Sequence, residues 1–223
     1  MKHSAGHLAA LTALLLLLSC LLSACSGSPT KLTESNGVYR NKKGDLAVVR
    51  AAESYYAIRP GDDVQAVITA DGADGIPLYT VSGASDDLFA DQDLYVYIRE
   101  GAELPTLKEL GATQVTLYQY TDIRTSHHPV SALKDEEKVK DLVRLATEGE
   151  TIPAREVRQD FELRCEILFL ADGSSGIGIM LEYREFPSDV NGYGTNFIYD
   201  TDALCYIPVG DALNRYFFGE EAE

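Results

Sequence analysis

The chain has 223 residues, with 19 Lys and Arg against 35 Asp and Glu, which gives a formal net charge of −16 at pH 7. Nucleic-acid binding rests on Lys and Arg that neutralise phosphates, so this balance argues against a nucleic-acid partner. The length suffices for one large or two small domains.

The first 25 residues combine three features of an export signal. Lys2 precedes a mainly apolar run of 15 residues, Leu8 to Leu22. A membrane-spanning helix needs about 20 residues, whereas this length fits the apolar core of a secretory signal. The run ends in Leu22-Ser23-Ala24-Cys25, and a Ser/Gly-rich stretch follows.

These residues resemble the lipobox of bacterial lipoproteins. The resemblance implies that residues 1–24 are a signal peptide and that Cys25 carries a diacylglyceryl group, with palmitate-type chains in the membrane. It places the rest of the chain on the extracytoplasmic face of a bacterial cell membrane, with residues 25–36 as a lipidated flexible linker. The alternatives are an ordinary cleaved signal with an incidental cysteine and a short uncleaved anchor.

Residues 37–125 are expected to form a β-rich module. Short alternating segments end at turns rich in Gly and Asp, such as Pro60-Gly61-Asp62-Asp63. Leu94 to Ile98 is the strongest predicted strand, because its residues are mainly β-branched and aromatic. Pro105 and Gly111 bracket a short predicted helix over Leu104 to Leu110.

After a polar connector, residues 126–223 are expected to form a second module. Apolar residues at helical spacing predict a helix over Asp135 to Thr147. Four short strands follow between Phe161 and Ile207, and helical spacing recurs over Val209 to Phe218. The predicted fold class is α+β: mainly antiparallel sheet, with a strand-rich N-terminal half and a C-terminal helix–four-strand meander–helix unit.

Parts of this second module resemble small domains of uncharacterised lipoproteins of Gram-positive bacteria. The residues that carry the resemblance are Asp135 to Ala146, Phe161 to Tyr183 and Phe197 to Ile207. It implies no activity.

Cys165 and Cys205 are a candidate disulfide, since export permits one. In a simple meander, however, they lie on the first and fourth strands, about 14 Å apart. A disulfide needs Cα atoms within about 7 Å, so free thiols are favoured unless the sheet curls strongly or the strand order differs.

The sequence offers no catalytic or metal-binding motif. Gly173-Ser174-Ser175-Gly176 is one residue short of the serine-hydrolase pattern and joins two predicted strands. His127 and His128 are adjacent, so on an extended chain they point opposite ways. The densest acidic cluster does not match a calcium loop; it comprises Asp86, Asp87, Asp91 and Asp93. We therefore expect no metal and no cofactor.

Thirteen tyrosines fall mostly on predicted strands, where a half-buried position is ordinary. Tyr55, Tyr56, Tyr95 and Tyr97 are the candidates for ligand contact, with a sugar or a peptide. Together these patterns predict a lipid-anchored extracytoplasmic protein, a non-catalytic binding or accessory module with a protein or cell-wall partner. The alternative is an extracytoplasmic hydrolase with a carboxylate-based site, which requires two acids held close together. A third hypothesis is a sensor or accessory subunit of a membrane complex.

Overall fold

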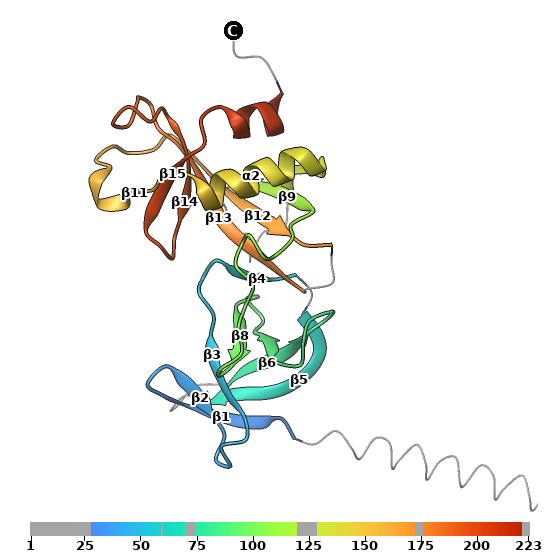
Figure 1. The fold of residues 1–223 in the computed structure, drawn as a ribbon. Helices are drawn as coiled ribbons and strands as arrows, with labels where there is room; N and C mark the ends of the chain where they lie inside the picture. Colours follow the sequence, from blue (N-terminus) through green and yellow to red (C-terminus); the bar gives the residue numbers. More distant parts are fainter. Residues whose placement is uncertain (1–27, 59, 70–74, 120–128, 173–175, 220–223) are drawn as a thin grey trace, which may run out of the picture. The chain divides into compact units, whose positions relative to one another are not determined.

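A computed structural model describes residues 28–58, 60–69, 75–119, 129–172 and 176–219 (Figure 1). Contacts among Cα atoms group Lys31–Glu223 as one compact unit. The expected signal peptide, Cys25, His127 and His128 lie outside the described residues. None of the helices that the structure describes is long and apolar enough to cross a membrane.

Seven strands close into an antiparallel barrel in the order β1, β2, β3, β8, β7, β6, β5. Their bounds are β1 Thr30–Ser35, β2 Val38–Arg40, β3 Ala47–Arg50, β5 Pro60–Thr69, β6 Ile76–Val81, β7 Leu88–Ala90 and β8 Val96–Arg99. The hydroxyl of Thr69 on β5 donates to the carbonyl oxygen of Leu32 on β1 at 2.9 Å. One cluster of buried side chains draws on nearly every strand, so the barrel encloses a packed core; it comprises Leu32, Val48, Ala66, Ile68, Leu78, Phe89 and Tyr97.

The other strands form a second antiparallel sheet in the order β10, β9, β12, β13, β14, β15, β11, with β4 also paired to β13. Their bounds are β4 Tyr55–Ala57, β9 Gln114–Gln119, β10 Pro129–Leu133, β11 Ile152–Pro153, β12 Leu163–Leu170, β13 Ile177–Glu185, β14 Asn196–Asp200 and β15 Cys205–Pro208. The start of β13 pairs with β4 and its end pairs with β14. The sheet thus combines strands from both expected modules.

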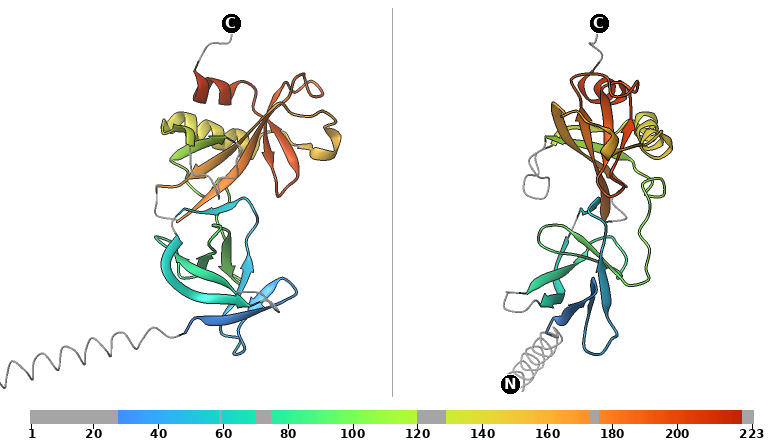
Figure 2. Two further views of the ribbon diagram at one scale, coloured as in Figure 1. Left: turned by 180° about the vertical axis from the view of Figure 1, so that it is seen from behind. Right: turned by 90° about the vertical axis from the view of Figure 1, so that its left-hand side faces the viewer.

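Helix α2, Glu136–Glu148, lies to one side of the second sheet (Figure 2). Its buried Val139 and Leu142 join the largest hydrophobic cluster, which also contains Ile167 and Phe169 of β12. The predicted helix over residues 135–147 is confirmed here, and its apolar face is the one that the periodicity indicated.

The predicted fold class is wrong in two respects. The described residues are mostly strand, with a closed seven-strand barrel and a second sheet in place of an α+β arrangement. The predicted helix–meander–helix unit is not formed, because its last helix, predicted over Val209–Phe218, is not a regular helix. The segment begins with a turn at Gly210, whose φ is +52°. After this turn come two α-helical residues, Ala212 and Leu213, and then a five-residue π-helix, η2 Asn214–Phe218, in place of a regular α-helix. The remaining helical segment of the described residues is a three-residue 3-10 turn after β11, η1 Ala154–Glu156.

Candidate functional site

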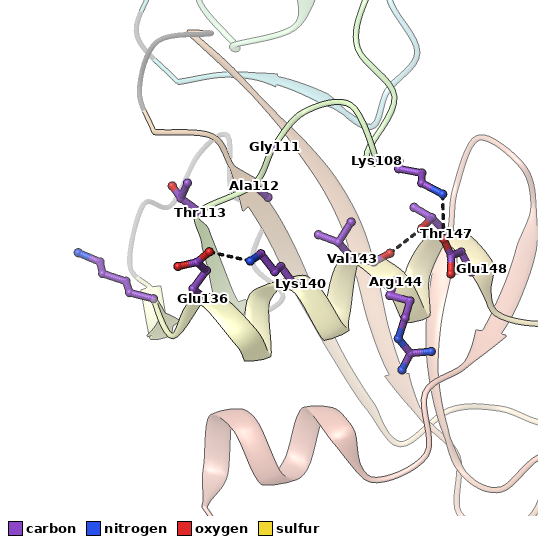
Figure 3. Close-up of a pocket in the computed structure, with 11 residues that line it drawn as sticks. Lys108, Gly111, Ala112, Thr113, Glu136, Lys140, Val143, Arg144, Thr147 and Glu148 are labelled. Carbon is purple, nitrogen blue, oxygen red and sulfur yellow. Dashed lines mark hydrogen bonds and ion pairs between the residues drawn. The ribbon is translucent and has the colours of Figure 1, made fainter.

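An open pocket of about 590 Å³ lies between α2 and the segment that precedes β9 (Figure 3). This volume falls within the about 300–1,000 Å³ of ordinary ligand sites. We call it the α2 pocket. Its lining comprises Lys108, Gly111, Ala112, Thr113, Lys134, Glu136, Lys140, Val143, Arg144, Thr147 and Glu148.

Helix α2 supplies one wall of the α2 pocket. Its six lining residues, from Glu136 to Glu148, recur at the three- and four-residue spacing of a single helix face. The helix begins where a carboxylate oxygen of Asp135 accepts from the N–H of Lys138 at 3.1 Å. It ends at Gly149, whose N–H donates to the carbonyl oxygen of Leu145.

The opposite wall is the segment before β9, where the sequence predicted a short helix. The structure has hydrogen-bonded turns instead: the N–H of Leu110 donates to the carbonyl oxygen of Thr106 at 2.8 Å. The Glu109 carboxylate accepts from the N–H of Thr106 at 3.0 Å and from its hydroxyl at 2.8 Å. Gly111 then adopts a left-handed φ of +63°, and the N–H of Thr113 donates to a carbonyl oxygen of β12.

Two ion pairs join four of the six charged side chains that line the α2 pocket. Lys108 Nζ lies 2.8 Å from an oxygen of Glu148, and Lys140 Nζ lies 2.6 Å from an oxygen of Glu136 (Figure 3). Each pair raises the pKa of its lysine and lowers the pKa of its glutamate, chiefly through the hydrogen bond between them. The directions favour the ionised form of every one of these groups at neutral pH.

The directions of these shifts bear on whether the pocket holds a general acid or base. A general acid or base works best when its pKa lies near the operating pH. Here the glutamate pKa values fall and the lysine pKa values rise, away from neutrality. The pocket therefore offers fixed charges and an apolar floor, an arrangement suited to binding.

The four candidate tyrosines do not form one ligand-contacting face. Tyr56 and Tyr97 are buried, and the hydroxyl of Tyr55 donates to the carbonyl oxygen of Pro105 at 2.8 Å. Tyr55 and Tyr56 belong to different hydrophobic clusters. Tyr95 is half-buried, with the guanidinium of an arginine, Arg50, 3.9 Å from its ring centre.

Cys165 and Cys205 are free thiols in the structure, the first buried and the second half-buried. Cys165 lies on β12 and Cys205 on β15, and two strands, β13 and β14, separate them. Burial raises the pKa of both thiols, which disfavours the reactive thiolate.

The acidic cluster has a structural role at Asp91. This carboxylate is buried, and it accepts from the N–H groups of Asp93 and Tyr95, both at 3.0 Å, and from the hydroxyl of Tyr97 at 3.3 Å. Asp87 pairs with Arg99 at 2.6 Å. No group of three or more His, Cys, Asp or Glu able to hold a metal occurs within the residues that the structure describes.

Sequence reasoning missed an ionic cluster on the far face of the second sheet. Glu182 on β13 accepts from the guanidinium groups of Arg164 and Arg184, at 2.9 and 2.7 Å among other contacts. Arg184 also donates to the hydroxyl of Tyr206 at 2.6 Å and lies 3.6 Å from the ring centre of Tyr199. The alternation along β12 and β13 places these charged residues on one face of the sheet, opposite the apolar residues, and a charged face of this kind is commonly exposed to solvent. They are instead largely buried, and the signal in the sequence was that Arg and Glu alternate on both strands.

The residues of the α2 pocket were missed as well. In the sequence alone, its cationic residues look like part of an ordinary solvated helix face and loop; they are Lys108, Lys134, Lys140 and Arg144.

Comparison with known proteins found no relative. No protein-family model, curated protein or solved structure matches the chain.

Proposed function

We propose that this chain is a lipid-anchored extracytoplasmic protein that binds a partner at the α2 pocket and catalyses no reaction of its own. The observation that carries the binding role is the pocket itself: its size is that of a ligand site, and its paired charges favour their ionised forms. A partner in the same membrane, such as a complex that this chain senses or assists, and a cell-wall component are both compatible with this role.

The anchor is inferred from the sequence. The apolar run of residues 8–22 and the Leu-Ser-Ala-Cys sequence that ends at Cys25 support a diacylglyceryl group on that sulfur. Two acyl chains suffice for stable attachment, at about 0.8 kcal/mol for each buried methylene. A tethered protein meets membrane and wall partners at high local concentration, so a shallow binding site is sufficient.

Metabolic labelling with a fatty-acid analogue tests the anchor. Cys25→Ala should abolish the label and release the protein from the membrane fraction. Cys20→Ala is the matched control, because this second cysteine lies in the segment expected to be removed, and it should label like the wild type. Label retained in Cys25→Ala, or none in the wild type, contradicts the anchor.

Photocrosslinking in intact cells tests the binding role. A photoreactive residue at position 147, which lines the α2 pocket, should crosslink to a protein or to wall material. The same residue at position 137 is the matched control, since Glu137 is an exposed residue of the same helix outside the lining. Equal crosslinking at both positions, or none at 147, would count against binding at the pocket.

One observation favours the alternative of a hydrolase. Glu166 and Glu182 stand directly opposite each other on β12 and β13, and both are buried. Such residues have Cβ atoms about 4.5–5.5 Å apart. Both oxygens of Glu182 are engaged by arginines, however, which leaves this carboxylate poorly placed to act as a nucleophile. Hydrolysis of a glycan or peptide panel that Glu166→Gln abolishes would establish the alternative.

A further inference from the structure

The charge balance of the α2 pocket is the reverse of that of the whole chain. The chain has 35 acidic and 19 basic residues, whereas the pocket lining has two acidic and four basic ones. The pairs Lys108–Glu148 and Lys140–Glu136 cancel, and the remaining cations are Lys134 and Arg144.

These two cations differ in their surroundings. Arg144 pairs at 2.5 Å with Asp141, which does not line the pocket. Lys134 is exposed, and none of the ion pairs among the described residues includes it. Asp141 offsets the charge of Arg144, and Glu137 lies 3.8 Å from Lys140 as a second acid beside Glu136. Lys134 is therefore the lining cation whose charge no described ion pair offsets, and salt limits the reach of the more distant negative surface to about 8 Å.

The floor of the pocket is apolar. Ala112 and Val143 contribute to it, and Val143 also packs against the main hydrophobic cluster. A second hollow of about 330 Å³ shares Thr113 and Lys134 with the α2 pocket, adds the apolar side chains of Ile58 and Leu170, and has one acidic residue, Asp172, in its lining. A ligand that carries only phosphates and hydroxyls would leave this apolar surface uncovered.

The length of the α2 pocket along the helix suits a short peptide in an extended conformation. The lining positions of α2 run from residue 136 to residue 148, a rise of about 18 Å along the helix. An extended peptide covers that length with about six residues.

We propose that the α2 pocket binds a short extended segment of a partner protein in which acidic residues flank an apolar side chain. The carboxylate nearest the helix start lies against Lys134, and the apolar side chain covers Val143 and Ala112. This assignment rests on the proposed binding function and defines the chemistry of the partner. Such a segment combines the negative charge and the apolar surface that this lining complements.

Panning of a random octapeptide phage library on the full chain in detergent tests the proposal. The enriched peptides should combine Asp or Glu with Leu, Ile, Val or Phe. In fluorescence polarisation, Lys134→Glu should weaken the binding of the synthetic peptides at least about fivefold, and higher salt should weaken it further. Lys42→Glu makes the same charge change in the turn between β2 and β3, outside the pocket, and should leave binding unchanged.

Three results would overturn the assignment: no enrichment, enrichment of basic or neutral peptides, or equal binding to Lys134→Glu. Competition by soluble poly(glycerol phosphate) as strong as by free peptide would overturn it too, since the site would then recognise charge alone. Circular dichroism of Lys134→Glu verifies the fold. The crosslink from position 147 separates the two proposals: a protein crosslink without acidic peptides overturns this inference alone, whereas loss of both overturns the binding function.

Discussion

Removal of the Glu182 side chain should be among the most destabilising single changes in the second sheet. The side chain of Glu182 is 9% exposed, and that of its partner Arg184 is 13% exposed. Glu182→Ala leaves the charge of Arg184 buried without its carboxylate partner. Loss of one member of a buried ion pair costs about 3–5 kcal/mol.

Thermal unfolding followed by circular dichroism measures the effect. For a chain of this size, 1 kcal/mol shifts Tm by about 2–4 °C, so Glu182→Ala should lower Tm by about 6–20 °C. Glu182→Gln keeps the shape and one acceptor oxygen and should fall between Glu182→Ala and the wild type. Glu148→Ala is the control, because its pair with Lys108 is exposed, at 51% and 68%, and Tm should not change measurably. A shift below about 2 °C for Glu182→Ala would refute the argument that this cluster is desolvated.

Three further predictions concern the barrel, the second sheet and the thiols. Asp91→Ala should destabilise the fold by about 3 kcal/mol in urea unfolding, because three donors lose their acceptor. Burial raises the pKa of Asp91, so the proton-linked part of its contribution to stability is greatest below its ordinary pKa of 3.8 and is lost as pH rises through the raised value; Asp91→Asn should remove this pH dependence. Gly178→Ala should cost about 1–3 kcal/mol, because its Cβ would lie 2.8 Å from a carbonyl oxygen of β12, and an unchanged urea midpoint would contradict that packing. In thiol titration the buried Cys165 should react only on unfolding and Cys205 sooner; rapid reaction of both would show a looser sheet.

Local signals predicted part of this fold. The helix α2 follows from Asp135 at its cap, from buried Val139 and Leu142 at helical spacing, and from Gly149 at its end. These signals all lie within one short segment, so the sequence alone was sufficient to predict the helix. The strands β12 to β15 were likewise visible from alternation and turns.

Long-range pairing could not be predicted. Barrel closure depends on β3 pairing with β8 and on contact between β5 and β1, and no local pattern specifies those partners. The predicted strand from Leu94 begins later, because Leu94 adopts a φ of +66° in a turn that Asp91 stabilises. Burial of Glu182 was missed for a related reason: alternation shows which residues share a face, but not whether that face is covered.

The candidate site was harder to predict than the fold. Lys108 and Glu148 are 40 residues apart in the sequence and meet only because the segment before β9 packs beside α2. Local patterns in a single sequence do not indicate which residues so far apart will form an ion pair. Of the four tyrosines chosen for their residue type, Tyr56 and Tyr97 are buried in the core, and Tyr55 and Tyr95 are half-buried.

Hydrogen–deuterium exchange tests the central claim most directly, by comparing the tagged chain in the membrane fraction of cells that produce it with the same chain in protein-free liposomes. Binding at the α2 pocket predicts slower exchange in native membranes for residues 108–113 and 136–148, with the barrel strands unchanged. Exchange that is identical in the two membranes, or protection confined to the barrel, would contradict the account.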